Sequence, residues 1–82
     1  MASYNEILTQ VYSVLAPFTK DEQPLTEETA LVADLGLDSI QVMRLLLEIE
    51  DYFDISIPVN ILPDVRTIGD LVGQLEKLVN KG

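Results

Sequence analysis

Apolar residues recur at intervals of three and four in three long stretches of the chain, which is the spacing of helices that bury one face. The first stretch covers residues 4–16 and follows Ser3, which suits an N-cap. The second covers residues 40–53. The third begins after Thr67, and Asp70 stands at capping-box distance from that threonine. Three long helices are therefore expected.

The connection from residue 18 to residue 37 is long for so small a domain. Several apolar side chains in it can attach it to the core, namely Leu25, Leu31, Val32, Leu35 and Leu37. The run 26–29 suits a turn, and Gly36 suits a backbone with positive φ. We expect an irregular loop that is held against the helices at several points.

Between the second and third long helices, residues 55–58 alternate like a strand but have no partner strand in the sequence. We expect an extended connector with Ile57 buried, then one helical turn over residues 59–62 that Pro63 ends early. The whole chain, residues 1–82, is predicted to be a single all-α domain. Its architecture is a small four-helix bundle with three long helices, a short third helix and a long loop between the first two.

The inventory of side chains excludes most catalytic chemistry. The chain has 82 residues and contains no cysteine, no histidine and no tryptophan. Without these groups it cannot form a Ser-His-Asp triad, a Cys–His pair or a zinc site. The acidic residues do not follow the alternating ligand spacing of an EF-hand calcium loop. We therefore expect a protein that is not an enzyme and holds no metal.

The charge is strongly acidic, with 14 acidic against 5 basic residues and a formal net charge of −9. This charge repels nucleic acid and anionic membrane surfaces and attracts basic patches on partner proteins. No apolar run reaches the roughly 18–20 residues of a membrane span, and no signal peptide is visible at the N-terminus. A cytoplasmic monomer without membrane insertion is expected, and the start at Met1 favours a free protein over an excised module.

The segment with chemical promise is Asp34–Ile40, where a turn containing Gly36 leads into Asp38-Ser39 at the start of the second helix. The first N–H groups of a helix are unpaired and its dipole is positive there, so this position favours a phosphate. Taken alone, the pair Asp38-Ser39 is better explained as an N-cap. Two residues do not make a motif.

The longer context resembles the phosphopantetheine-attachment signature of acyl carrier proteins, which centres on Gly-x-Asp-Ser followed by Leu or Ile. The residues that carry this resemblance are Leu35-Gly36-Leu37-Asp38-Ser39-Ile40. Further segments resemble the same family in order and spacing, namely the lead-in 28–37, the helix 45–53, the acidic-x-x-Ile-Pro segment 54–58 and the Thr-hydrophobic stretch 64–71. The resemblance extends from the first helix to about Leu78.

By this resemblance, Ser39 is the attachment point of the covalent phosphopantetheine arm, which derives from coenzyme A. Asp38 would help a phosphopantetheinyl transferase to bind Mg²⁺ during the transfer. The arm supplies the thiol, so the protein needs neither a cysteine nor a general base of its own. Acyl-loading and acyl-processing enzymes are the further partners that the family implies.

The second helix carries more apolar residues than a core stripe requires. Val42, Leu45, Leu46, Ile49 and Phe53 form the core stripe, and Ile40, Met43 and Leu47 form a second line on the side of Ser39. The family implies a partner-docking surface there, to which we also assign Arg44, Glu48 and Asp51. The alternative is that the second line covers the loop 18–37.

Two positions depart from the family pattern. The start of the second helix has Gln41 and Arg44 where fatty-acid carriers commonly have acidic residues. This difference points to partners outside ordinary fatty-acid synthesis. The short third helix is apolar, with Ile61 and Leu62 before Pro63. Such a segment could reshape an acyl pocket between the second and third helices.

The sequence thus predicts a carrier of acyl thioesters that serves lipid, fatty-acid or polyketide-type synthesis. One alternative is a peptidyl or aminoacyl carrier of nonribosomal synthesis. The other is an unmodified helical interaction module, in which Ser39 keeps a free hydroxyl. Cargo, chain length and pathway are not encoded in any motif of the sequence.

Overall fold

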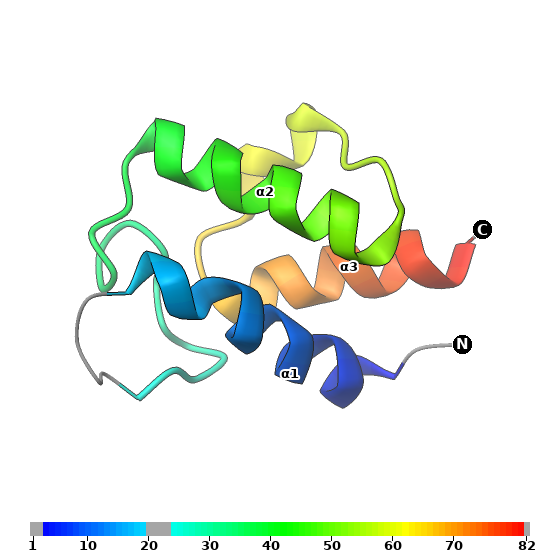
Figure 1. Ribbon diagram of the computed structural model, residues 1–82, viewed down its shortest axis with the longest axis horizontal. Helices are drawn as coiled ribbons and strands as arrows, with labels where there is room; N and C mark the ends of the chain where they lie inside the picture. Colours follow the sequence, from blue (N-terminus) through cyan, green and yellow to red (C-terminus); the bar gives the residue numbers. More distant parts are fainter. Residues whose placement is uncertain (1–2, 20–23, 82) are drawn as a thin grey trace.

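The computed structural model of the protein describes residues 3–19 and 24–81. Its α-helices are α1 (Tyr4–Leu15), α2 (Ser39–Phe53) and α3 (Ile68–Lys81). Two 3₁₀ helices complete the order, η1 (Ala16–Phe18) after α1 and η2 (Val59–Asp64) between α2 and α3. Helix α1 runs antiparallel to the other two α-helices (Figure 1). The described residues contain no strand, so the prediction of a small all-α bundle is confirmed.

The first turns of the α-helices are fixed by side chains next to them in the sequence. The Oγ of Ser3 accepts a hydrogen bond from the backbone N–H of Glu6 at 3.2 Å. At α3, the hydroxyl of Thr67 accepts from the N–H of Asp70 at 3.1 Å, and the carboxylate of Asp70 accepts from the N–H of Thr67 at 3.2 Å. The Asp70 carboxylate accepts from the N–H groups of both Thr67 and Arg66, and these two hydrogen bonds lower the pKa of Asp70 below its usual value.

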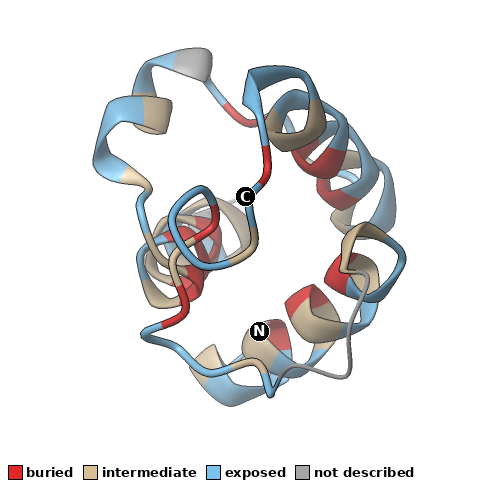
Figure 2. Cartoon of the chain, turned by 90° about the vertical axis from the view of Figure 1, so that its left-hand side faces the viewer, coloured by how far each residue is buried: buried red, intermediate tan, exposed pale blue. Residues whose placement is uncertain are grey.

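The core lies between the three α-helices, and the buried positions face the centre of the molecule (Figure 2). Helix α1 packs more extensively on α3 than on α2. The fully buried side chains of the three α-helices are Ile7, Val11, Leu15, Leu45, Ile49, Ile68, Leu71, Val72 and Leu75, and Leu31 and Leu37 of the loop are buried with them. Burial of such side chains contributes roughly 1.5–3 kcal/mol each. All nine helical residues belong to the apolar stripes that predicted the helices.

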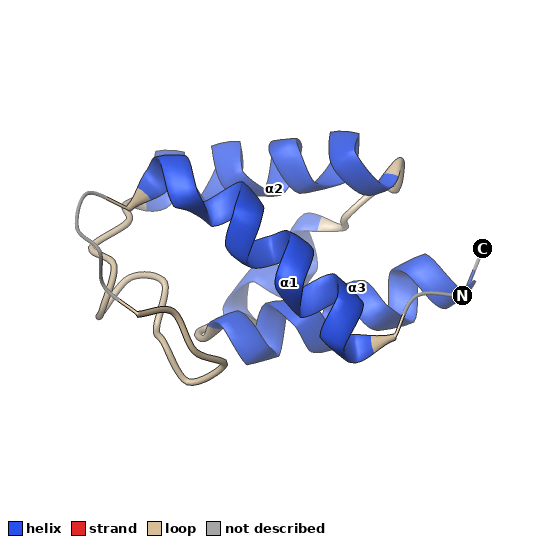
Figure 3. Cartoon of the chain, turned by 60° about the horizontal axis from the view of Figure 1, so that its bottom comes forward, coloured by secondary structure: helices blue, strands red, loops and turns tan. Residues whose placement is uncertain are grey.

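The long loop gathers at the end of the molecule where α1 ends and α2 begins (Figure 3). Its second half is joined to the start of α3 by three backbone hydrogen bonds. The N–H of Gly69 donates to the carbonyl of Glu27 at 2.8 Å, and the N–H of Ile68 donates to that of Thr29 at 3.0 Å. The N–H of Leu31 donates to the carbonyl of Arg66 at 2.9 Å. The loop is therefore held by backbone bonds as well as by apolar side chains.

One prediction about the connections needs correction. The short third helix is the 3₁₀ helix η2, and Pro63 lies inside it instead of ending it. A 3₁₀ segment tolerates the proline because the bonds on either side, from Ile61 to Pro58 and from Val65 to Leu62, do not use its missing N–H. Ile57 is buried, as predicted. Residues 20–23 of the predicted loop lie outside the described residues.

Candidate functional site

The start of α2 is a complete capping box. The carboxylate of Asp38 accepts from the N–H of Gln41 at 2.8 Å, and the side-chain oxygen of Gln41 accepts from the N–H of Asp38 at 3.1 Å. The role of Gln41 in this cap was not predicted, because Gln41 was noted only as a departure from an acidic pattern. The spacing Asp-x-x-Gln was the available signal, because it is the spacing of a capping box.

The turn before α2 presents Ser39 to solvent. Gly36 has a φ of +69°, which lets the chain reverse before the helix. The carboxylate of Asp34 accepts a hydrogen bond from the N–H of Ala30 at 2.7 Å, which holds the two ends of the turn 30–34 together. Leu37 is buried, whereas Asp38 and Ser39 are exposed. A buried anchor thus stands directly before two accessible polar residues.

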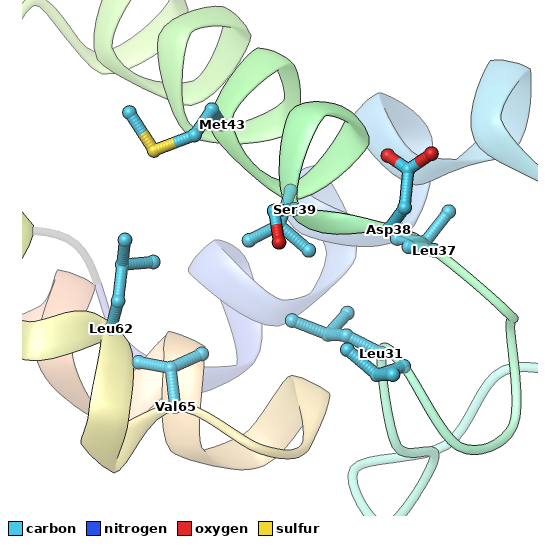
Figure 4. A pocket seen from close by; sticks show the side chains of 9 residues that line it. Leu31, Leu37, Asp38, Ser39, Met43, Leu62 and Val65 are labelled. Atoms are coloured by element: carbon cyan, nitrogen blue, oxygen red, sulfur yellow. The ribbon is translucent and has the colours of Figure 1, made fainter.

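A pocket of about 460 Å³ opens beside Ser39. Figure 4 shows the Ser39 hydroxyl directed toward this space and the Asp38 carboxylate directed away from it. The walls come from the loop, from α2 and from the η2 region, with Leu31, Val32, Leu37, Asp38, Ser39, Val42, Met43, Leu62 and Val65 as lining residues. Apart from Asp38 and Ser39, every lining side chain is apolar, so the pocket suits a hydrocarbon group.

The connection from α2 to η2 sets the position of one pocket wall. Asp54 ends α2 in the left-handed conformation, with φ 55° and ψ 50°. The side chain of Glu50 then accepts a hydrogen bond from the N–H of Ile57 at 2.6 Å. This bond ties the extended connector back to α2. Leu62 on η2 consequently lies across the pocket from Met43 (Figure 4).

The apolar residues of α2 separate into the two lines that the sequence predicted. Leu45, Leu46 and Ile49 are buried in the core. Ile40 is 72% exposed, Leu47 60% and Met43 39%. Ile40 and Leu47 are too exposed to cover the loop, whereas Met43 lines the pocket together with loop residues. Arg44, Glu48 and Asp51 are also exposed.

Sequence reasoning missed most of the pocket. Val32 was expected to attach the loop to the core, but it is 64% exposed and stands at the pocket rim. Val42 was assigned to the core stripe and lines the pocket as well. Val65 was not singled out at all. The pocket is formed by segments far apart in the sequence, so only the apolar run at residues 61–62 gave a signal.

Two further observations concern metal sites and membrane spans among the described residues. Within residues 3–19 and 24–81, no group of three or more acidic side chains is arranged to hold a metal ion. Over the same residues, no helix is both long and apolar enough to cross a membrane. The described residues thus combine an exposed serine at a capped helix start with an adjacent apolar pocket.

Comparison with known proteins identifies the class. Residues 9–75 match the family described as phosphopantetheine attachment site. The acyl carrier protein of Thermotoga maritima is 36% identical over 78 residues, which cover 94% of this chain and 96% of the relative. The chain therefore belongs to the acyl carrier protein family, whose members carry phosphopantetheine covalently.

Two other relatives extend the comparison. The meromycolate extension acyl carrier protein of Mycolicibacterium aurum is 32% identical over 78 residues, covering 94% of this chain and 80% of the relative. A solved structure from Mycobacterium tuberculosis, described as an acyl carrier protein, superposes with a TM-score of 0.78 at 27% identity. The superposition covers 85% of this chain and 95% of the Mycobacterium tuberculosis chain. The fold and the family assignment agree.

Proposed function

We propose that Ser39 carries the phosphopantetheine arm and that the protein carries acyl groups as thioesters on it for lipid, fatty-acid or polyketide-type synthesis. The observation that carries this proposal is the placement of Ser39, exposed at the start of α2 and directed toward an apolar pocket. The signature residues 35–40 support the same serine. When attached, the arm supplies the thiol that the protein lacks.

The start of α2 fits a phosphodiester on Ser39. The N–H groups at a helix N-terminus and its positive dipole stabilise a phosphate there. The cap uses Asp38 Oδ1 as its acceptor, and the carboxylate faces solvent on the side away from the pocket. Asp38 is thus accessible to a transferase, and we assign it a part in holding Mg²⁺ while the serine is modified.

The pocket favours an acyl cargo over an aminoacyl cargo. Beyond Ser39 and Asp38, whose carboxylate is directed away from it, the pocket is lined only by aliphatic side chains and a thioether. A charged amine inside it would lose its hydration without gaining a charged partner. Each CH₂ of an acyl chain that enters contributes about 0.8 kcal/mol. Because one relative is a meromycolate extension acyl carrier protein, a role in lipid synthesis is the favoured pathway within this proposal.

The protein acts as a carrier and not as a catalyst under this proposal. Its partners are a phosphopantetheinyl transferase and the enzymes that load and process the acyl group. We place it in the cytoplasm as a monomer, where its net charge of −9 keeps copies apart and attracts basic partners.

The test is intact mass after incubation with coenzyme A, Mg²⁺ and a broad-specificity transferase. The wild type should gain one phosphopantetheine, and Ser39→Ala should gain none. Ser56→Ala is the matched control, because Ser56 is also exposed but lies in the connector after α2, and it should be modified like the wild type. A folded wild type that several transferases leave unmodified would refute the proposal and favour the unmodified interaction module.

Cargo class is tested separately with the modified protein. Loading with a medium-chain acyl group should shift the amide resonances of Leu31, Val42 and Leu62, which line the pocket. Loading with an aminoacyl group should leave these three residues unchanged. The reverse pattern would support the peptidyl carrier alternative.

A further inference from the structure

The exposed side of α2 next to Ser39 has an unusual combination of side chains. Ile40, Met43 and Leu47 lie exposed on it, and Met43 lines the pocket together with the exposed Val32 of the loop. Arg44 lies beside this apolar row and is the one basic residue of α2. Between Ser39 and Leu47 the helix contains no acidic residue.

The second half of the helix has the opposite charge. Glu48, Glu50 and Asp51 follow within one turn, and Asp54 ends the helix. Arg44 and Asp51 are seven residues apart, which corresponds to about 10 Å along the helix axis. The exposed face of α2 is therefore apolar and cationic near Ser39 and anionic at its far end.

Arg44 is available to a partner. It is exposed, and no hydrogen bond or ion pair to another described residue engages it. Glu48 stands one turn after it, but an acidic residue on the C-terminal side of a basic one is the less favourable order for an intrahelical pair. The guanidinium can thus offer a planar pair of donors to a carboxylate from another molecule.

We propose that the partner protein that docks on this apolar face of α2 presents a carboxylate opposite Arg44. Its basic residues then lie about 6 Å further along, opposite Glu48, and about 10 Å further along, opposite Asp51. The proposal rests on the proposed function, because the partner is an enzyme that works on the arm at Ser39. It specifies that enzyme by a surface that contains both charges, whereas the net charge of −9 alone would call for a purely basic one.

A second copy of the chain is a poorer occupant. Two antiparallel α2 helices could place Arg44 of each copy near acidic residues of the other. However, each chain carries a net charge of −9, so the approach of two copies is opposed over their whole surfaces. A partner with mixed charges satisfies Arg44 without this cost.

The test is a binding cycle with two synthetic peptides on the unmodified protein. The first is an amphipathic helix of about 18 residues with a leucine face, one Glu, and two Lys about 6 Å and about 10 Å further along. The second differs only by Glu→Gln and is therefore more positively charged. Binding is followed by two-dimensional amide NMR, which gives both the affinity and the residues contacted.

The two peptides separate specific pairing from general attraction. A protein with a net charge of −9 should prefer the Gln peptide if only net charge matters. We expect the wild type to bind the Glu peptide roughly two- to fivefold more tightly, the range of an exposed ion pair. The preference should disappear in Arg44→Gln and persist in Lys77→Gln, which removes the same charge from an exposed position on α3.

Several results would overturn the proposal. The wild type could prefer the Gln peptide, or the preference for the Glu peptide could survive in Arg44→Gln. The amide resonance shifts could leave out Ile40 and Leu47. The Glu peptide could also fail to bind at millimolar concentration. A dimer in analytical ultracentrifugation that Arg44→Gln dissociates would assign the face to a second copy. The peptide experiment uses the unmodified protein, so its result does not depend on the phosphopantetheine arm. Mass analysis of the modification of Ser39 tests the proposed function separately.

Discussion

Gly69 in the first turn of α3 lies directly against the long loop. A Cβ atom at this position would lie 3.0 Å from the carbonyl oxygen of Glu27 and 3.3 Å from both the Glu27 Cβ and the Tyr4 hydroxyl oxygen. The N–H of Gly69 donates to the same carbonyl at 2.8 Å. A methyl group at position 69 would therefore push away the Glu27 carbonyl, which accepts the hydrogen bond from the N–H of the same position. Gly73, in the same helix, would meet no atom within 4 Å.

The two glycines should respond to alanine in opposite directions. In a helix, alanine is favoured over glycine by about 0.5–1 kcal/mol, so Gly73→Ala should stabilise the protein by about that amount. In Gly69→Ala the same gain is opposed by overpacking, which costs about 1–3 kcal/mol. The backbone of Glu27 cannot rotate away as a side chain could. We expect a net loss of about 1 kcal/mol.

Urea denaturation followed by circular dichroism measures both variants. The midpoint should rise for Gly73→Ala and fall for Gly69→Ala, with an unchanged slope in each case. Amide hydrogen exchange should also accelerate at Ile68 and Gly69, whose N–H groups bind the loop. If Gly69→Ala gains as much stability as Gly73→Ala, the loop moves without cost, and the reasoning from close approach is wrong.

Three further predictions concern the turn, the cap and a tyrosine. Gly36→Ala meets no atom within 4 Å but has a φ of +69°, so it should lose about 1 kcal/mol from backbone strain alone; Gly36→Asn should lose less in the same urea assay, and equal losses would contradict this origin. Asp38→Ala removes the N-cap and should cost about 1 kcal/mol, whereas Asp38→Asn keeps an acceptor and should be nearly neutral; thermal unfolding that does not distinguish the two variants would argue against capping. The hydrogen bond from Tyr4 to Glu27 raises the pKa of Tyr4 from 10.0 to about 12. An ultraviolet titration should therefore show one tyrosine that ionises near pH 12, and this step should be absent in Tyr4→Phe. Because the pKa of Tyr4 is higher in the folded than in the unfolded protein, the hydrogen bond contributes fully to the free energy of unfolding below pH 10, and this contribution is lost as the pH rises toward 12. If Tyr4→Phe loses as much stability as the wild type over this pH range, the hydrogen bond is not the cause.

The helices and their starts could be predicted from the sequence because the interactions that form them are local. Ser3 and Thr67 bind backbone groups three residues away, and the apolar spacing of each helix is read directly from the chain. The same holds for the positive φ at Gly36. The candidate serine was found for a related reason, since the signature around it is one continuous run of six residues.

The pocket and the loop attachment could not be predicted because they join distant segments. Leu31 and Val65 line the same pocket, although one precedes α2 in the sequence and the other follows it. The bond from Leu31 to Arg66 spans 35 positions of the chain and leaves no periodic signal. Pro63 was misjudged for a different reason, because the rule against proline was applied to an α-helix and the segment is a 3₁₀ helix.

The hydrogen bond between the N–H of Leu31 and the carbonyl of Arg66 connects the loop wall of the pocket to the wall formed by the η2 region, through main-chain atoms alone. Side chains on these walls can therefore be exchanged without breaking the connection between them. Under the proposed function, substitutions at the half-buried Leu62 or Val65 would change the size of the accepted acyl group while the frame stays in place. A carrier built in this way can diverge toward new cargo in single mutational steps without first losing its fold.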